Sequence, residues 1–506
     1  MSDNLYQWFQ SQFPEDRAKP ALIHPDGSIL SYAELDQETA RLAGWLRGLD
    51  LKPSQPGVPG DRVSSQVPKS VNALLLYLAC LRGGFVFHPM NPAYQREELR
   101  YFLENAEPKL VVCAPERCEQ FAELIATDTQ LHTLGGTGSG SLTEAAADAE
   151  PHSGISSTEA DNLAALLYSS GTTGRPKGVM LTNRNLRSNA AVLVQAWGFS
   201  AEDVLVHALP IFHTHGLFVA VGCTLGSGAT MHWLPKFDPE DVLERLPRST
   251  TFMGVPTYYT RLLQSPGLTP EVCRSMRLFV SGSAPLLEET FRQFQERTGH
   301  TILERYGMTE IGMHLSNPLD GERRAGTVGQ PLPQAEIRVC DEQDQPVGPD
   351  TPGGLQVRGP NVFPEYWKLP EKTAEEFTED GWFRTGDLAQ RGEDGHVTLV
   401  GRGKDVVISG GLNVYPKEVE QVLDTLPGVL ESAVIGRPHP DFGEAVTAVV
   451  IPESGATLEA SALIAAVREQ LANFKCPKTI HFLPELPRNA MGKVQKNELR
   501  KQFGNG

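Results

Sequence analysis

The sequence predicts an α/β fold in which parallel or mixed sheets are flanked by helices. Three strand-like runs, Val204–Leu209, Thr251–Val255 and Leu278–Ser281, are separated by helical patterns such as Pro256–Leu263. Strands that alternate with helices are typical of largely parallel sheets with helices packed on their faces. The 506 residues also exceed what one hydrophobic core supports, since single cores stop growing at about 250 to 300 residues. We therefore expect more than one domain.

The N-terminal part shows the same alternation. Leu74–Leu81 is a continuous apolar run, and Gly84–Met90 has the pattern of a short strand and turn. The Gly/Ser-rich stretch Gly135–Gly140 predicts a surface loop. Farther along, the apolar run Leu163–Leu167 precedes a helix-like segment that begins near Thr182.

The pattern changes twice in the C-terminal half. From Val328 to Val357 short strands are broken by Pro and Gly, which predicts a small β subdomain over about residues 326–400. After that region come one amphipathic helix and two strand-like runs, at Leu458–Leu471, Ser432–Ile435 and Ala445–Val450. We expect a large domain over residues 1–403, which includes the β subdomain, and a small α+β domain over residues 404–506.

Composition and charge exclude several kinds of partner. With 40% hydrophobic and 21% charged residues, the chain resembles an ordinary soluble globular protein. Its net charge of −17 argues against a nucleic acid or an anionic membrane as the partner. No apolar stretch approaches the roughly 20 residues that a membrane-spanning helix needs.

Targeting features and cysteines favour a cytoplasmic location. Residues 1–8 lack the basic region and apolar run of a signal peptide, and residues 503–506 do not form a peroxisomal tripeptide. The seven cysteines are scattered and include no Cys-x-x-Cys pair, as expected for a reducing compartment.

The segment Tyr168–Gly178 has the composition of a phosphate-binding loop. It places four hydroxyl side chains, several small residues and Lys177 directly after an apolar run. Backbone N–H groups of such a loop can approach phosphate oxygens closely, and the lysine adds a point charge. A Walker loop is excluded, because Pro176 stands where its second glycine belongs. On composition alone, a flexible connector is the alternative.

Four further segments follow this loop in the chain: Tyr306–Glu310, Thr385–Asp387, Gly401–Asp405 and Pro487–Lys493. Together with Ser169–Gly178 they resemble the ordered signatures of the acyl-adenylate-forming superfamily. That superfamily comprises acyl-CoA synthetases, adenylation domains of peptide synthetases and luciferases. The resemblance covers nearly the whole chain, and it implies ATP and CoA as co-substrates, Mg²⁺ as the metal and a mobile C-terminal domain.

The resemblance implies how the triphosphate would be held. The loop would cradle the β- and γ-phosphates, and Thr309 would contact the α-phosphate. Glu310 would bind Mg²⁺ with Thr173 nearby, since a hard cation shared with phosphates takes one or two carboxylates. The loop residues implied in this role are Ser169, Ser170, Gly171, Thr172, Thr173, Gly174 and Lys177.

The nucleoside would be held by residues from three segments. The ring of Tyr306 would pack on adenine, and the ribose hydroxyls would bond to Asp387 with help from Arg402. The residues implied at the adenine are Tyr306, Gly307, Ser283 and Ala284, the last two within the turn Ser281–Ala284.

Lys493 is the implied catalytic lysine of the adenylation step. Its ammonium would bridge the carboxylate substrate and the α-phosphate. For thioester formation the C-terminal domain would rotate about Lys404, and Gly410 and Gly411 would let the pantetheine arm of CoA pass close to the backbone. His213 matches the position of a ring that guards the acyl-substrate entrance.

Four runs narrow the resemblance to malonyl-CoA synthetases, which act on malonate and often on methylmalonate. These runs are Leu209–Val219, Gly254–Leu263, Glu304–Glu310 and Ser316–Pro318. A dicarboxylate leaves a second charge inside the acyl pocket, and an arginine is its natural partner. Arg261 is our candidate, with Arg305 and Arg324 as weaker alternatives. The predicted acyl-site residues are His213, Arg261, Ser281 and Met308.

Two segments depart from the wider family pattern, Gly353–Leu355 and Pro364–Trp367. We expect both in the β region, away from the chemistry. Three other functions remain open. The chain could be a ligase for another short-chain or aromatic acid, a stand-alone adenylation enzyme that loads a carrier protein, or an inactive relative that only binds ligands. The carrier-protein function is not favoured.

Overall fold

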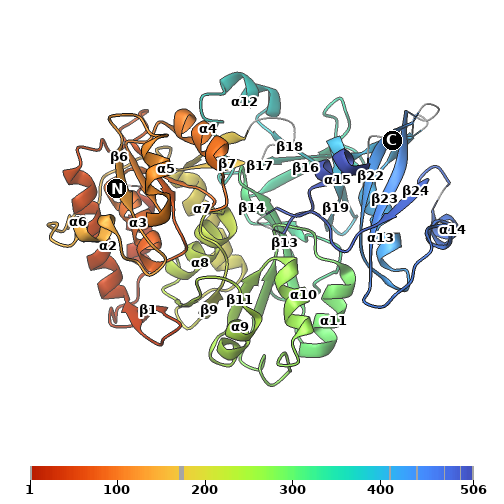
Figure 1. The fold of residues 1–506 in the computed structure, drawn as a ribbon, viewed down its shortest axis with the longest axis horizontal. Coiled ribbons are helices and arrows are strands. Elements are labelled where there is room, and N and C mark those ends of the chain that lie inside the picture. Colours follow the sequence, from red (N-terminus) through yellow and green to blue (C-terminus); the bar gives the residue numbers. More distant parts are fainter. Residues whose placement is uncertain are drawn as a thin grey trace.

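The computed structural model describes residues 3–169, 176–409, 412–439, 443–471, 473–489 and 492–503. Two large sheets and their helices form the N-terminal part, and the C-terminal segment, blue in Figure 1, lies beside them. The prediction of an α/β fold with a smaller C-terminal domain is confirmed.

The first large sheet has six strands in the order β6-β5-β3-β4-β7-β8. All neighbours are parallel except β7 and β8. The strands are β3 (Arg62–Gln66), β4 (Val86–Pro89), β5 (Leu110–Cys113), β6 (Gln130–Thr133), β7 (Leu163–Ser169) and β8 (Lys177–Thr182). The apolar run Leu163–Leu167 thus lies in a central strand whose neighbour β4 runs in the same direction.

The second large sheet has nine strands in the order β15-β14-β13-β12-β11-β9-β10-β1-β2. Strands β13, β12, β11, β9, β10 and β1 are parallel, and antiparallel strands complete both edges. The strands are β1 (Pro20–Ile23), β2 (Ile29–Ser31), β9 (Val204–His207), β10 (Thr230–Trp233), β11 (Thr251–Gly254), β12 (Leu278–Ser281), β13 (Ile302–Met308), β14 (Gly312–Ser316) and β15 (Gln330–Pro331).

Helices cover these sheets, and their ends follow local sequence signals. The side chain of Thr182 accepts a hydrogen bond from Asn185 N and thereby caps α7, near the start that the sequence predicts. The helices are α1 (Leu5–Gln12), α2 (Tyr32–Gly48), α3 (Val71–Gly83), α4 (Arg96–Ala106), α5 (Cys118–Ala122), α6 (Ser141–Ala146), α7 (Asn183–Ala196), α8 (Val221–Leu225), α9 (Pro239–Arg245), α10 (Pro256–Gln264) and α11 (Glu288–Thr298). Short 3₁₀ turns span Pro115–Arg117 and Leu246–Arg248, and a π-helical turn spans His215–Ala220.

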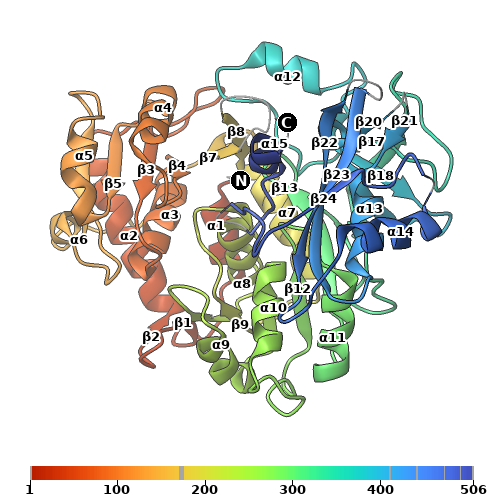
Figure 2. The ribbon, with the colours of Figure 1, turned by 45° about the vertical axis from the view of Figure 1, so that its right-hand side comes forward.

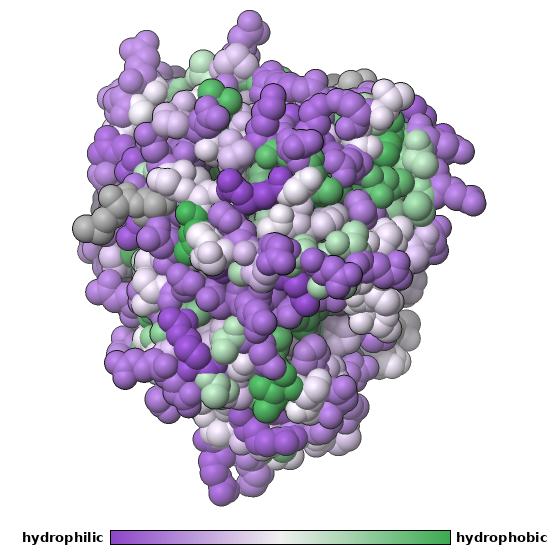
Figure 3. All heavy atoms as spheres, turned by 90° about the vertical axis from the view of Figure 1, so that its left-hand side faces the viewer, coloured by the Kyte–Doolittle hydropathy of each residue, from purple (hydrophilic) through white to green (hydrophobic). Residues whose placement is uncertain are grey.

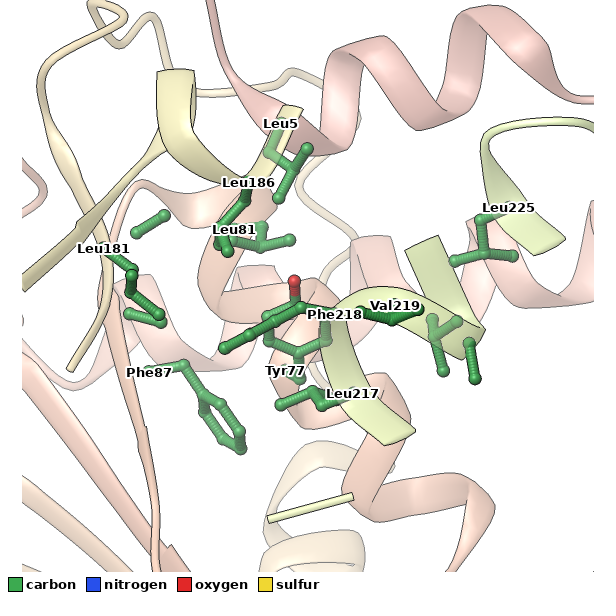
Figure 4. Packing of buried hydrophobic residues seen from close by; sticks show 14 of the residues in the cluster. Leu5, Tyr77, Leu81, Phe87, Leu181, Leu186, Leu217, Phe218, Val219 and Leu225 are labelled. Carbon is green, nitrogen blue, oxygen red and sulfur yellow. The ribbon is translucent and has the colours of Figure 1, made fainter. Parts of the chain in front are cut away.

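Helix α3 is the centre of the largest hydrophobic core. Its apolar run Leu74–Leu81 is almost completely buried, which explains why the run shows no polar face. Figure 4 shows Tyr77 and Leu81 of α3 beside Phe218 of the π-helical turn and Phe87 of β4. One continuous core therefore connects the first sheet with the segment that follows β9.

A four-stranded antiparallel sheet in the order β16-β17-β18-β19 comes next in the chain. Its strands are β16 (Glu336–Cys340), β17 (Gly353–Arg358), β18 (Phe383–Arg391) and β19 (Val397–Arg402), with α12 (Pro370–Glu376) between β17 and β18. The short strand β15, although it lies in the region predicted as a β subdomain, pairs with β14 of the nine-stranded sheet.

The C-terminal segment has its own sheet and core. Strands β21-β20-β23-β22 are neighbours in that order, and β24 pairs with β23. The elements are η4 (Gly403–Asp405), β20 (Val407–Ser409), β21 (Leu412–Val414), α13 (Pro416–Asp424), β22 (Val429–His439), β23 (Gly443–Pro452), α14 (Ala460–Gln470), β24 (Thr479–Phe482) and α15 (Lys496–Phe503). The predicted amphipathic helix Leu458–Leu471 corresponds to α14, whereas the shorter helices α13 and α15 were not predicted.

The molecular face in Figure 3 is mostly hydrophilic, with apolar side chains in scattered patches. Among the described residues, none of the helices is both long and apolar enough to span a membrane.

Candidate active site

The predicted site residues gather where parallel strands end. Strands β9, β11, β12 and β13 of the nine-stranded sheet end at His207, Gly254, Ser281 and Met308. Strand β7 of the six-stranded sheet ends at Ser169. Ligands of α/β proteins bind in the crevice at the carboxyl ends of such strands. The topology therefore brings motifs that are distant in the sequence to one region.

The ends of the predicted phosphate loop are held together by strand pairing. Ser169 at the end of β7 faces Lys177 at the start of β8. The hydroxyl of Tyr101 on α4 donates to the carbonyl of Pro176 at 2.6 Å, which fixes the return of the loop. Seven predicted site residues lie outside the described residues: Ser170, Gly171, Thr172, Thr173, Gly174, Gly410 and Gly411.

Lys177 and Glu310 belong to one polar network. Lys177 Nζ donates to Glu376 Oε1 at 2.7 Å, and its ammonium lies 4.1 Å from the centre of the Tyr366 ring. The Tyr366 hydroxyl is 2.7 Å from Glu376 Oε2 and 3.2 Å from Oε1 of the buried Glu310. Burial raises the pKa of Glu310 above its ordinary value.

This network corrects one expectation. Tyr366 belongs to Pro364–Trp367, which we expected to lie in the β region and away from the chemistry. Its backbone instead bridges Val179 of β8, outside the four-stranded sheet. The departure from the family pattern therefore lies next to the predicted phosphate and magnesium residues.

Tyr306, Asp387 and Arg402 form a second cluster. The Tyr306 hydroxyl donates to Asp387 Oδ2 at 2.6 Å, and Arg402 Nε pairs with Asp387 Oδ1 at 2.9 Å. Asp387 and Arg402 face each other across β18 and β19, which explains how two separate motifs meet. Burial, with the nearby Asp387 charge, raises the pKa of Tyr306 well above its usual value, so the phenol is neutral.

Lys493 approaches this cluster from the C-terminal segment. Asn489 Oδ1 accepts from Lys493 N at 3.0 Å and shapes the turn before the lysine. Gly492, with φ 74°, packs against α10: a Cβ on it would lie 3.3 Å from Thr257 Oγ1. Burial, and then the charge of Arg402, lower the pKa of Lys493 to about 8. Lys404 is exposed in η4, between β19 and β20.

His213 and Thr309 line a common small hollow, together with residues of the first sheet such as His88 and Tyr168. Burial lowers the pKa of His213 to about 4, so its imidazole is neutral at pH 7. Beside Phe212 a larger cavity of about 410 Å³ opens, lined by apolar and aromatic side chains and by Lys69. Phe212 lines both spaces, whereas His213 lines the smaller one.

A buried arginine lies behind the turn Ser281–Ala284. Arg305 of β13 is 3% exposed, and its Nε and Nη2 atoms have no hydrogen-bond partner among the residues that the structure describes. Its guanidinium occupies the space in front of Gly282, where a Cβ would lie 2.2 Å from Cζ. Burial lowers the pKa of Arg305 to about 9, which leaves it charged at pH 7.

Other buried polar atoms lie near this turn. His215 Nδ1 is 3.3 Å from Ser283 Oγ, while His215 Nε2 and Ser281 Oγ have no hydrogen-bond partner within the described part of the chain. Ser283 has a φ of 74°, a strained value for a residue with a side chain. Donors without acceptors around a buried cation are the features of an anion site.

Arg261, our sequence-based candidate for this role, is exposed on α10. Of the three arginines that the sequence offered, Arg305 is the buried one, whereas the guanidinium of Arg261 is hydrated. Arg324 is also excluded from the pocket, because it is partly exposed and pairs with Asp394 and Glu322. Arg305 lies in the run Glu304–Glu310 and His215 in the run Leu209–Val219, both of which resemble malonyl-CoA synthetases.

Ala284 lies in the turn that follows β12, and Gly307 lies within β13. A Cβ on Gly307 would lie 2.0 Å from the carbonyl oxygen of Gly312, so only glycine fits there. Met308 ends β13 and is half-buried.

Comparisons with known proteins agree with this arrangement. The family model "AMP-binding enzyme" matches residues 9–367, and its C-terminal domain model matches residues 418–493. The mitochondrial malonate–CoA ligase ACSF3 of Mus musculus is 37% identical, covering 93% of this chain and 85% of the relative. The feruloyl-CoA synthase of an Amycolatopsis species is also 37% identical, covering 95% and 96%.

The solved structure of ATP-bound MatB from Rhodopseudomonas palustris is 50% identical, with a TM-score of 0.97, and covers 100% of this chain and 99% of that chain. Its apo form, at the same identity and coverage, gives a TM-score of 0.87. The arrangement described above is thus closer to the ATP-bound form of that protein. This chain belongs to the AMP-binding enzyme family and is an AMP-forming acyl-CoA ligase, an acid–thiol ligase.

Proposed function

We propose that this enzyme is an ATP-dependent malonate–CoA ligase, with methylmalonate as a second substrate. Malonate would attack the α-phosphorus of ATP to form malonyl-AMP and release pyrophosphate. The CoA thiol would then displace AMP to give malonyl-CoA. The observation that carries the proposal is the buried Arg305, whose guanidinium has two nitrogens without a partner.

The charge of Arg305 favours a dicarboxylate. The first carboxylate of any substrate is consumed at the α-phosphorus, so only a second carboxylate can remain to pair with the guanidinium. Glu304 does not take that role, because successive strand residues point to opposite faces of the sheet and its Oε1 accepts from Leu286 N at 3.1 Å. A buried cation without an anion is costly, and a malonate carboxylate would relieve that cost.

Ser281, His213 and Met308 complete the proposed acyl site. Ser281 ends β12 in register with Glu304, and its buried hydroxyl is a candidate donor to the substrate. The neutral ring of His213 stands at the hollow that it shares with Thr309. A ring in that place separates the acyl pocket from the side where CoA approaches.

The nucleotide would be bound by the two clusters already described. Asp387 and Arg402 are placed for the ribose, Tyr306 with the turn Ser283–Ala284 for adenine, and Lys177 for the outer phosphates. Glu310 fits a magnesium site, since its buried carboxylate lies near Ser169 and Lys177 and lacks a cationic hydrogen-bond partner among the described residues. When bound, Mg²⁺ neutralises phosphate charge; Thr173 is its other predicted neighbour.

Adenylation and thioester formation would use two orientations of the C-terminal domain. In the present one, Lys493 lies near Asp387 and Arg402, which suits a lysine that bridges carboxylate and α-phosphate. Rotation about Lys404 would withdraw it and bring Gly410 and Gly411 to the pantetheine arm. The cavity beside Phe212 is the space we assign to that arm. We place the domain boundary at 403/404.

The experiment is pyrophosphate release with ATP, Mg²⁺ and CoA over malonate, methylmalonate, succinate, acetate, octanoate, benzoate and ferulate. We expect malonate to dominate, and Arg305→Ala to remove that preference. Arg261→Ala is the matched comparison, because Arg261 is an exposed arginine of the same region and should retain the preference. Malonate preference that survives Arg305→Ala would refute the proposed pocket.

The alternative is a ligase for another short-chain or aromatic acid, which the 37% identity to a feruloyl-CoA synthase supports. Ferulate or benzoate as the best acid in the panel would establish it. Transfer of the acyl group to a carrier protein in place of CoA remains a less favoured third function. The cytoplasmic location stays a prediction, and the relative from Mus musculus is mitochondrial by name.

A further inference from the structure

We infer that Glu376, at the end of α12, is a positioning residue for ATP, because its carboxylate holds Lys177 and Tyr366 in the places from which they face the phosphates and Glu310. This inference rests on the proposed roles of Lys177 and Glu310 in ATP binding. It is independent of which acid the enzyme activates.

Both carboxylate oxygens of Glu376 accept hydrogen bonds. Oε1 accepts from Lys177 Nζ at 2.7 Å, and Oε2 accepts from the Tyr366 hydroxyl at 2.7 Å. Burial favours the protonated acid, but the hydrogen bonds from Lys177 and Tyr366 outweigh it and lower the pKa of Glu376. Glu376 is therefore a carboxylate that accepts hydrogen bonds from two inward side chains, and its Oε1 also lies 3.4 Å from the ammonium of Lys372 on the same helix.

These contacts fix the ammonium of Lys177 at the phosphate loop. The side chain has four rotatable bonds, but the Tyr366 ring on one side and Glu376 on the other hold its end in place. An ammonium has three N–H donors, and Glu376 occupies one of them. The remaining donors can turn toward phosphate oxygens without loss of the ion pair.

Tyr366 transmits the position of Glu376 to Glu310. The Tyr366 hydroxyl lies within hydrogen-bond distance of two acceptors, Glu376 Oε2 at 2.7 Å and Glu310 Oε1 at 3.2 Å. Since a phenol has one hydrogen, the two carboxylates share a single donor, which couples the position of Glu310 to that of Glu376. One carboxylate on α12 thus orients both the lysine and the proposed magnesium ligand.

Helix α12 has no buried residue, so packing does not account for its position. Figures 1 and 2 both show it at the top of the molecule, where Arg384 Nη1 of β18 donates to the Glu375 carbonyl at 3.2 Å. Thr373 Oγ1 accepts from Tyr366 N at 3.0 Å, which ties the helix to the segment that carries Tyr366. Its most inward contacts are those of Glu376, which favours a functional role for this side chain.

The test compares Glu376→Ala with Glu375→Ala. Glu375 is the preceding residue on the same helix, and its carboxylate pairs with the partly exposed Lys372 at 2.8 Å. We expect Glu376→Ala to raise KM for Mg·ATP about ten-fold, since hydrogen bonds to charged groups are lost, and to leave KM for the acid within about two-fold. Glu375→Ala should leave both constants and Tm unchanged.

A double-mutant cycle with Lys177→Ala identifies the route of the effect. If Glu376 acts through Lys177, the double variant should have nearly the same KM for Mg·ATP as Lys177→Ala alone. Effects of Glu376→Ala and Lys177→Ala on the KM for Mg·ATP that add in the double variant would overturn the inference. An unchanged or lower KM for Mg·ATP in Glu376→Ala alone would overturn it as well. A lower value would mean that Glu376 competes with ATP for Lys177.

The readout separates this inference from the malonate proposal. The ATP titrations use whichever acid is best in the panel, and binding of a non-hydrolysable Mg·ATP analogue is measured by calorimetry without acid. Weaker analogue binding by Glu376→Ala supports the inference even if malonate is not the substrate. Equal analogue binding by Lys177→Ala and the wild type would refute the role of Lys177 itself.

Discussion

Arg305 and Lys177 are both cations of the site, but the protein treats them differently. Lys177 is half-buried and paired with the carboxylate of Glu376, whereas Arg305 is almost fully buried and keeps two unpaired nitrogens. The ion pair of Lys177 can be shared with phosphates or exchanged for them. Among the described residues Arg305 has no such partner, and in the proposed function a substrate carboxylate would supply its anion. A cation with a protein partner suits a ligand common to the whole family, while a cation without one selects the acid.

Replacement of the buried cation itself should give the largest effect. Arg305→Met keeps an apolar side chain of similar length and removes the charge. We expect the ratio of kcat/KM for malonate to that for butyrate to fall by about 10³, because a charged carboxylate would then be buried unpaired. Parallel saturation curves for the two acids measure this ratio. An unchanged ratio would mean that Arg305 and Lys177 do not differ in the way described.

Loss of the paired cation should affect ATP and not the choice of acid. We expect Lys177→Ala to lower kcat/KM for ATP about 10²-fold, since a charge near the phosphates is lost. The ranking of acids should stay the same, because Lys177 lies at the phosphate loop and Arg305 at the acyl pocket. Initial rates with varied ATP against two acids test this, and a change in the ranking would contradict it.

The third cation, Lys493, predicts a pH dependence. Burial first, and then Arg402, lower its pKa to about 8 from the ordinary value of 10.5. The ammonium needed for adenylation is present below this pKa and is lost as pH rises through it. Pyrophosphate release should therefore fall up to about ten-fold per pH unit above 8. Lys493→Arg keeps its charge, so any activity that it retains should lack this decline; an identical decline would refute the assignment.

The smallest expected effect comes from Glu304, the neighbour of Arg305 on the opposite face of β13. Burial raises the pKa of Glu304 to about 7 from the ordinary value of 4.5. The folded state thus retains a proton that the unfolded state loses between these values, so stability falls as pH rises through this window. Glu304→Gln should raise Tm by about 1–3 °C at pH 8.

The same variant has two built-in controls. At pH 5 the gain in Tm should be much smaller, because the wild-type carboxyl is then mostly protonated in the folded state. Its kcat/KM for malonate should equal that of the wild type. A loss of malonate activity would show that the two faces of β13 are not independent.

Most of the fold was predictable because its signals are local. The strand Leu278–Ser281 has the predicted bounds, and Pro256–Leu263 lies in α10. Thr182 caps α7 through a hydrogen bond within one helical turn. Apolar periodicity and caps depend on neighbours in sequence, so the chain alone contains them.

The acyl pocket was harder to predict, because burial of a charge depends on packing across strands. Three arginines were candidates, and their sequence contexts did not show which of them is buried. Arg305 is buried because β13 pairs with β12 in a register that sets its guanidinium against Gly282. Arg261 lies on an exposed face of α10, so its side chain remains in solvent.

The sequence by itself determined the fold class, the order of the motifs and the residue types that a nucleotide and an acid require. Only the tertiary structure decided which side chains meet. Glu376 and Lys177 are 199 positions apart, and Tyr366 lies in a segment that no periodicity connects with either. Such contacts arise when separate elements pack together, so the physical reason lies in the long-range geometry and not in any local pattern.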